Sequence, residues 1–139
     1  LFRSALQTVF MYSRLYPGFD IIYSNALITK DIDHSTFSGS YIWKDANVKE
    51  QLLSGCCVGP FPLLKKKSIM EAGMFNTNFH ISGDYEMWCR MQSKGYKFAK
   101  IDEPIGVYYE NPQGTSTQQT AERYTENVRQ DTAIRQRYA

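Results

Sequence analysis

The spacing of hydrophobic and polar positions changes several times along the chain, and each change marks an expected element. Residues 1–16 carry apolar side chains at intervals of three and four, as an amphipathic helix does. Pro17 and Gly18 end this helix. Residues 19–29 (FDIIYSNALIT) are rich in β-branched and aromatic side chains, which predicts a strand. The polar residues 30–40 predict a loop.

Further helices are expected after this loop. They are predicted at residues 45–55, 67–75, 84–94 and 121–139. Asp45 and Ser68 are the expected N-caps of the first two, because a short polar side chain can accept a hydrogen bond from the first turn. Gly73 is expected near the end of the second helix, and Gly95 ends the third.

Two further segments are predicted to be extended chain. Residues 56–66 (CCVGPFPLLKK) predict an edge strand or a shaped loop, because proline cannot donate to a central ladder. Residues 96–110 predict a strand pair or one bent strand, with Pro104 at the break. Residues 111–117 predict a loop. Helices that alternate with strands favour an α/β layer structure in a single domain, residues 1–139.

Composition narrows the class of protein. A chain of 139 residues, 42% hydrophobic and 22% charged, is typical of one globular domain and excludes disordered and collagen-like classes. A net charge of +2 is too small to indicate a nucleic-acid partner, so we expect none. No apolar run approaches the roughly 20 residues of a membrane helix, and no signal peptide opens the sequence. The three cysteines lack C-x-x-C spacing, and we expect reduced thiols in a cytoplasmic protein.

The segment Ser82–Arg90 (SGDYEMWCR) concentrates reactive side chains at the start of a predicted helix. Asp84 is either the N-cap of this helix or a general base, and Ser82 can cap instead and release Asp84. Glu86 either hydrogen-bonds a substrate or favours the positive end of the helix. Its four-residue spacing from Arg90 predicts an ion pair on one helix face.

Three segments together resemble a known family. They are residues 54–76 (SGCCVGPFPLLKKKSIMEAGMFN), 82–102 (SGDYEMWCRMQSKGYKFAKID) and 105–117 (IGVYYENPQGTST). In order and spacing they look like the acceptor-side half of bacterial family-two glycosyltransferases, nucleotide-sugar enzymes with the A-type α/β fold. The resemblance implies a partial A-type fold, a mixed sheet flanked by helices, without the N-terminal nucleotide-binding half. Since the chain opens at Leu1, inside a predicted helix, we expect it to be cut from a longer protein.

The resemblance also implies a site. Asp84 stands in the motif that supplies the catalytic base, which must accept the acceptor hydroxyl's proton as that oxygen attacks the anomeric carbon. A helix N-terminus gives such a base a rigid support. The residues implied for the acceptor wall are Val58, Gly59, Pro60 and Phe61. Further substrate contacts are implied for Gly83, Glu86 and Trp88.

A divalent cation, Mn²⁺ or Mg²⁺, is expected in the complete enzyme, with ligands mostly outside this chain, so no metal ligand is assigned here. Asp31–Asp33 (DID) spells the family's D-x-D motif, but it follows the wrong strand and is interpreted as a surface loop. Asn111 stands where many relatives carry histidine, and an amide is a poorer metal ligand than imidazole. Whether Asn111 contributes to metal binding stays open. No Q-x-x-R-W motif is present, which argues against the processive synthases.

The expected partners are a nucleotide-sugar donor, a glycan or lipid-linked acceptor, and the N-terminal half of the same protein. Without that half we expect an exposed apolar face and self-association. The run Lys65–Lys67 is either solvated or in contact with a phosphorylated lipid, which would place the protein at the inner face of the membrane. His80 is either a rival base or an incidental loop residue.

The alternative function is a non-catalytic carbohydrate-binding module. In this interpretation Asp84 only caps its helix, and the aromatic side chains, 14% of the chain, stack on a glycan.

Overall fold

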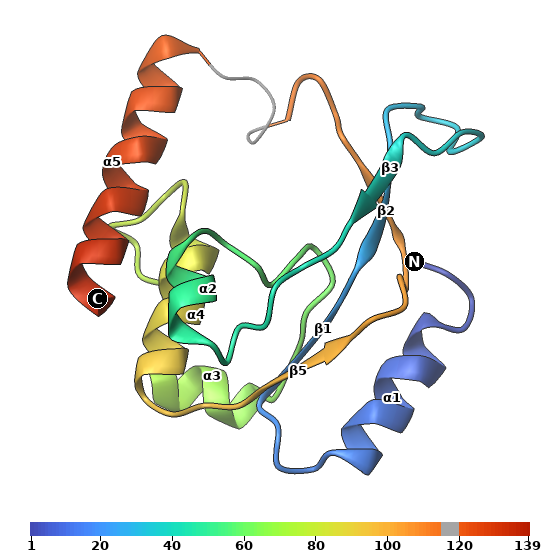
Figure 1. Ribbon diagram of the computed structural model, residues 1–139, viewed down its shortest axis with the longest axis horizontal. Coiled ribbons are helices and arrows are strands. Elements are labelled where there is room, and N and C mark those ends of the chain that lie inside the picture. Colours follow the sequence, from blue (N-terminus) through green and yellow to red (C-terminus); the bar gives the residue numbers. More distant parts are fainter. Residues whose placement is uncertain (115–119) are drawn as a thin grey trace.

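The computed structural model describes residues 1–114 and 120–139 of the chain (Figure 1). Its helices are α1 (Ala5–Leu15), α2 (Lys49–Leu53), α3 (Lys66–Ala72), α4 (Gly83–Ser93) and α5 (Ala121–Tyr138). Its strands are β1 (Ile21–Ser24), β2 (Ala26–Thr29), β3 (Gly39–Tyr41), β4 (Leu63–Leu64), β5 (Phe98–Ile101) and β6 (Val107–Tyr109). The fold is mixed α/β, with two small mixed sheets flanked by helices.

Each sheet has three strands and contains one parallel and one antiparallel pair. In the first, of order β4-β1-β5, β1 runs parallel to β5 and antiparallel to β4. In the second, of order β3-β2-β6, β2 runs parallel to β6 and antiparallel to β3. The short strand β4 lies at a sheet edge, as the prolines just before it, Pro60 and Pro62, predict.

The strand predicted over residues 19–29 is divided at Asn25 into β1 and β2, so that one chain segment enters both sheets. The Asn25 side chain accepts a hydrogen bond from the backbone N–H of Trp43 (3.0 Å) and donates one to the carbonyl of Asp102 (2.6 Å). The amide thereby pairs backbone groups of two other segments at the point where the strand is interrupted. Its bond to the Trp43 N–H also holds the backbone of the segment that follows β3.

Side chains alternate between the two faces of β1, and each face packs into a different hydrophobic core cluster. Ile22 packs with Ala5 and Val9 of α1 on one face. Ile21 and Tyr23 belong to a larger cluster on the other face, together with most of the buried side of α4. Figure 1 agrees, with α1 on one side of β1 and β5 and helices α3 and α4 on the other.

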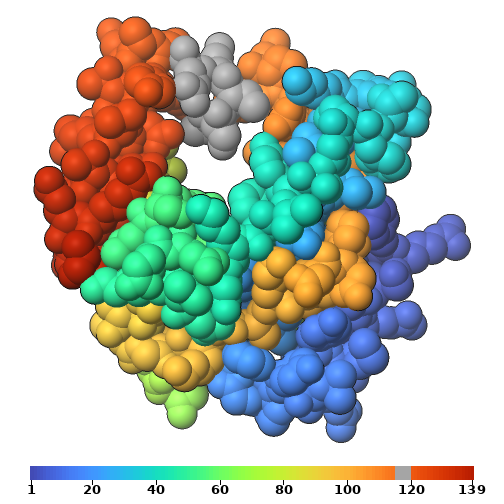
Figure 2. Space-filling view, viewed as in Figure 1, coloured from blue at the N-terminus to red at the C-terminus, as the bar shows by residue number. Residues whose placement is uncertain are grey.

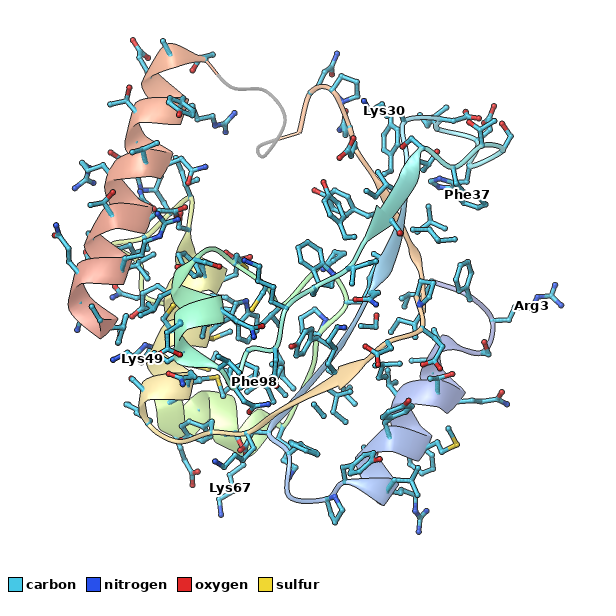
Figure 3. All side chains as sticks on the ribbon, in the orientation of Figure 1. Arg3, Lys30, Phe37, Lys49, Lys67 and Phe98 are labelled. Atoms are coloured by element: carbon cyan, nitrogen blue, oxygen red, sulfur yellow. The ribbon has the colours of Figure 1, made fainter. Side chains whose placement is uncertain are left out.

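Side-chain positions follow this division. Phe98 of β5 is 1% exposed and lies among the inward-pointing side chains, whereas Lys67 of α3 points away from the body of the molecule (Figure 3). The whole run Lys65–Lys67 is exposed, and Lys67 lies 3.8 Å from Glu71 one turn further along α3.

The predicted helix ends are confirmed where glycine defines them. Gly73 ends α3 in the left-handed conformation (φ 104°), and Gly95 follows α4 with φ 82°.

The predicted N-caps are wrong. Helix α2 begins at Lys49, and the Asp45 carboxylate instead accepts from the N–H of Asn47 (2.9 Å). Ser68 lies inside α3 and donates to Asp20 (2.6 Å). The predicted loop over residues 30–40 also gives way to strand at its end, where β3 pairs with β2.

Helix α1 exposes apolar side chains along one side. These are Leu6 (73% exposed), Phe10 (59%), Met11 (52%) and Leu15 (61%). An unpaired apolar face of this kind was expected from the sequence, and the expected self-association stays a prediction. Within the described part of the chain, no helix is both long and apolar enough to cross a membrane.

Candidate functional site

Asp84 lies in the first turn of α4 and is exposed. Helix α4 begins at Gly83, with Ser82 in the N-cap position, so the sequence interpretation of Asp84 as the N-cap is wrong by two positions. One carboxylate oxygen of Asp84 accepts from the adjacent N–H of Tyr85 (2.7 Å). The carboxylate therefore lies at the positive end of the helix dipole.

Helix α5, rather than Ser82, supplies the hydrogen bonds that hold the start of α4. The side-chain oxygen of Gln130 accepts from the N–H groups of both Ile81 and Ser82, at 3.1 Å each. The Ser82 hydroxyl donates to Asp131 (2.6 Å) instead of capping its own helix. Since Gln130 is 1% exposed, these bonds lie away from water and fix the first turn of α4 firmly.

A cavity of about 240 Å³ opens beside Asp84, and we call it the aromatic cavity. Its lining residues are Tyr41, Trp43, Cys56, Gly59, Pro60, Asp84 and Tyr108. The rings of Tyr41 and Trp43 are stacked, with centroids 4.8 Å apart and planes 22° apart. Tyr108 meets Tyr41 edge-on at 6.0 Å. The space-filling view shows the surface hollowed between the cyan segment after β3 and the red helix α5 (Figure 2).

Two of the four residues predicted for the acceptor wall line this cavity. Gly59 and Pro60 do so, but Val58 is fully buried in the core. Phe61 packs on the core cluster beneath α1, on the other side of the chain. Val58 and Phe61 are therefore corrected to structural residues, because Val58 is enclosed in the larger core cluster and Phe61 packs against the cluster under α1.

Gly59 has a specific steric role. It has φ +23°, and a Cβ built there would lie 2.4 Å from Nε1 of Trp43. The indole of Trp43 therefore rests directly on the backbone of Gly59, which only glycine permits. The Trp43 Nε1 atom is buried and has no hydrogen-bond partner among the described residues.

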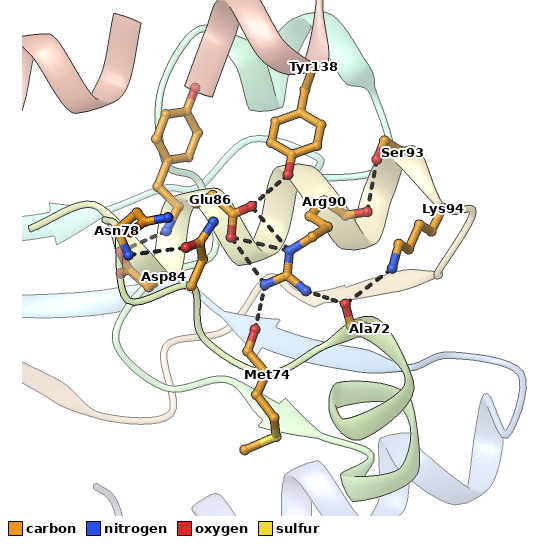
Figure 4. Close-up of polar contacts among 11 residues, drawn as sticks. Ala72, Met74, Asn78, Asp84, Glu86, Arg90, Ser93, Lys94 and Tyr138 are labelled. Carbon is orange, nitrogen blue, oxygen red and sulfur yellow. Dashed lines mark hydrogen bonds and ion pairs between the residues drawn. The ribbon is translucent and has the colours of Figure 1, made fainter. Parts of the chain in front are cut away.

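Glu86 and Trp88 do not reach the cavity, which corrects their predicted substrate contacts. Trp88 is 3% exposed and lies in the core. Glu86 is fully buried, and Tyr138 of α5 donates to its carboxylate (2.6 Å). Arg90 contacts the same carboxylate through Nε and Nη2 (Figure 4), at 3.1 Å each, which confirms the predicted ion pair. Gly83 is half-buried where α4 begins.

His80, the rival base, lies outside the aromatic cavity. Its Nδ1 atom is 3.1 Å from the side-chain nitrogen of Gln130, and it lines a separate surface hollow beside α5 with Glu126. Since His80 is not among the residues that line the aromatic cavity, Asp84 is the better-placed base for a ligand bound there.

The described residues do not fit a divalent cation, because none of their His, Cys, Asp and Glu side chains gather in a group of three or more. Asp31 and Asp33 lie in the surface loop between β2 and β3, as interpreted from the sequence, and Asp31 accepts from the Asp33 N–H (3.1 Å). Asn111 lies just after β6 and accepts from the N–H of Gln113 (2.9 Å). The last part of the family-like segment, residues 115–117, lies outside the described residues.

Cys56 lines the aromatic cavity close to Asp84. Although the residue is exposed, withdrawal of its thiol from water and, second to it, the negative charge of Asp84 together raise the pKa of Cys56 to about 12. The thiol is therefore protonated at neutral pH and is not a nucleophile.

This proximity predicts how Cys56 reacts. Only the thiolate attacks iodoacetamide and displaces iodide, so we expect Cys56 to be alkylated more slowly at pH 8 than a free cysteine. Asp84→Asn removes the neighbouring charge and should speed this reaction about three- to fivefold, the effect of one unit charge a few ångströms away near water. The rate is measured by mass spectrometry of the Cys56 peptide. Asp33→Asn, an exposed loop carboxylate, is the control. An unchanged rate in Asp84→Asn would contradict the electrostatic contact.

The sequence interpretation missed Tyr41, Trp43 and Tyr108, which form the aromatic wall. The only signal for them in the sequence is the recurrence of aromatic residues in two segments, one at β3 and one at β6. These segments lie far apart along the chain, so the sequence does not show that they meet. In comparisons with known proteins, the chain matches no protein-family model and no characterised protein.

Proposed function

We propose that this chain supplies the acceptor site and the catalytic base of an inverting, non-processive glycosyltransferase, within the acceptor-side half of an A-type fold. The observation that carries the proposal is one cavity shared by Asp84 and the stacked rings of Tyr41 and Trp43. Stacked aromatic faces suit the apolar face of a sugar ring, and a carboxylate suits its hydroxyls.

In this mechanism the acceptor sugar lies against Trp43 and Tyr41, with one hydroxyl directed at Asp84. The hydroxyl oxygen attacks the anomeric carbon of the donor from the side opposite the leaving group. Its proton passes to the Asp84 carboxylate as the bond to the nucleotide diphosphate breaks, which inverts the anomeric centre. Rigid support of α4 by Gln130 keeps the carboxylate in place during this step.

The donor is a nucleotide sugar, and the acceptor is a glycan or a lipid-linked sugar. Since the described residues do not fit a divalent cation, we assign the Mn²⁺ or Mg²⁺ of the complete enzyme to other residues, and no step above depends on it.

Gly59→Ala in the complete enzyme tests the acceptor site. The new Cβ would lie 2.4 Å from Trp43 Nε1, so the indole must move out of its stack. We expect the acceptor KM to rise about tenfold or more, because a displaced ring no longer touches the sugar. The donor KM should change by less than about twofold. Equal changes in both would place this loop elsewhere. Gly18→Ala, whose Cβ would meet nothing within 4 Å, is the matched control.

The stacked pair also favours a second candidate, a carbohydrate-binding module without catalysis. Such a module needs the rings of Tyr41 and Trp43 but no base. It would bind saccharides as tightly with Asp84→Asn as without it and would transfer no sugar from any nucleotide donor. Measured transfer by the unmodified protein excludes this candidate.

A further inference from the structure

A second cavity lies on another side of Asp84, and we call it the polar cavity. It also measures about 240 Å³. Its lining residues are Cys56, Ile81, Ser82, Asp84, Tyr85, Asn127 and Asp131. Asp84 and Cys56 line both cavities, so the two cavities meet at the proposed base.

The polar cavity differs in chemistry from the aromatic one. Ser82, Asn127 and Asp131 supply a hydroxyl, an amide and a carboxylate. The Asn127 side-chain oxygen lies 3.2 Å from the Ser82 hydroxyl, whose single proton goes to Asp131 at the shorter distance of 2.6 Å, so Asn127 offers the cavity both its oxygen and its amide N–H groups. Asp131 accepts from Ser82 through one oxygen, and its other oxygen lies 4.0 Å from Arg135. Mixed donors and acceptors of this kind match sugar hydroxyls, each of which both donates and accepts.

Tyr85 also lines the polar cavity, although it is only 2% exposed. Burial raises the pKa of Tyr85 to about 12, against the opposing effect of the nearby Arg135, so its hydroxyl keeps its proton at neutral pH. Tyr85 therefore gives the cavity an uncharged wall beside the polar groups of Ser82 and Asn127.

We propose that the polar cavity is a second saccharide subsite, so that the bound ligand spans two sugar units with Asp84 at their junction. One ring lies against Trp43 and Tyr41, and the other is held by Asn127 and Asp131 of α5. This inference rests on the proposed function, since it takes the aromatic cavity as a sugar site. Asp84 and Asp131 both line the polar cavity, so the second unit is a neutral sugar rather than a uronic acid or a phosphorylated one.

Two side-chain signals in ¹H–¹⁵N spectra of the chain report on the two cavities separately. The Trp43 indole N–H reports on the aromatic cavity, and the Asn127 amide reports on the polar one. The buried Trp88 indole serves as an internal reference. The probes are cellobiose, maltose, lactose and chitobiose, each compared with the methyl glycosides of its own monosaccharides.

We expect the monosaccharides to shift the Trp43 signal only. At least one disaccharide should shift both signals and bind about tenfold more tightly, because one further set of hydrogen bonds contributes about 1 kcal/mol or more. The same disaccharide with a uronic acid as either unit should bind no better than the monosaccharide.

Asn127→Ala should lower the affinity for that disaccharide about three- to tenfold and leave monosaccharide affinity unchanged. Gln136→Ala, an exposed amide on the same helix outside the cavity, should change neither. Equal binding of mono- and disaccharides, or an unshifted Asn127 signal, would overturn the second subsite and leave the proposed function standing. A Trp43 signal that no saccharide shifts would overturn the sugar site itself, and the second subsite with it.

Discussion

Asp84→Asn is expected to lower sugar transfer by the complete enzyme about 10²- to 10⁴-fold, the usual contribution of a general base. Asparagine has nearly the same shape as aspartate but cannot take up a proton at neutral pH. Its side-chain oxygen can still accept from the Tyr85 N–H, which Asp84 holds at 2.7 Å. The free energy of unfolding should therefore change by less than about 1 kcal/mol, the value of one charge at a helix N-terminus.

The initial rate of sugar transfer is measured with a panel of nucleotide-sugar donors. Urea unfolding of the same samples gives the free energy of unfolding. Asp33→Asn removes an equally exposed carboxylate from the loop after β2 and should retain full activity. Saccharide binding at the Trp43 indole should survive in Asp84→Asn, because the aromatic wall is untouched. If Asp84→Asn keeps more than about a tenth of the normal rate, Asp84 is not the base.

The largest loss of stability is expected from Glu86→Ala, at about 3–5 kcal/mol. Glu86 is fully buried and bonded by Arg90 and Tyr138, and Arg90 itself is only 13% exposed. Without the carboxylate, the guanidinium of Arg90 keeps its charge in a site largely withdrawn from water. The Tyr138 hydroxyl also loses its acceptor, which weakens the contact between α4 and α5 (Figure 4).

Glu71→Ala is the matched control for this prediction. Glu71 and Lys67 form another ion pair at four-residue spacing on a helix, but their side chains are 55% and 84% exposed. Such a pair contributes about 0–0.5 kcal/mol. Urea unfolding compares the two variants, and Glu86→Gln, which keeps the side-chain volume, gives a value in case Glu86→Ala does not fold. Losses for Glu86→Gln and Glu71→Ala within about 0.5 kcal/mol of one another would show that burial of the Glu86 pair is unimportant.

The sequence alone determined the features of this protein that depend on neighbours along the chain. Helical spacing located α1, α4 and α5 to within a few residues, and Gly73 and Gly95 marked two helix ends, because left-handed backbone favours glycine. The pair between Glu86 and Arg90 was predictable for the same reason, since residues four apart meet on one helix face.

The tertiary structure decided which of these residues face the site. Tyr41, Trp43 and Tyr108 meet because β3 and β6 pair with the two edges of β2, although the two segments lie far apart in the sequence. Gln130 accepts the hydrogen bonds at the start of α4, and Tyr138 donates to the buried Glu86 carboxylate, because α5 packs against α4. Spacing along one element fixes which residues share a face, but not which other element that face meets. The identity of Asp84 as a candidate base was therefore available from its motif, whereas its cavity required the fold.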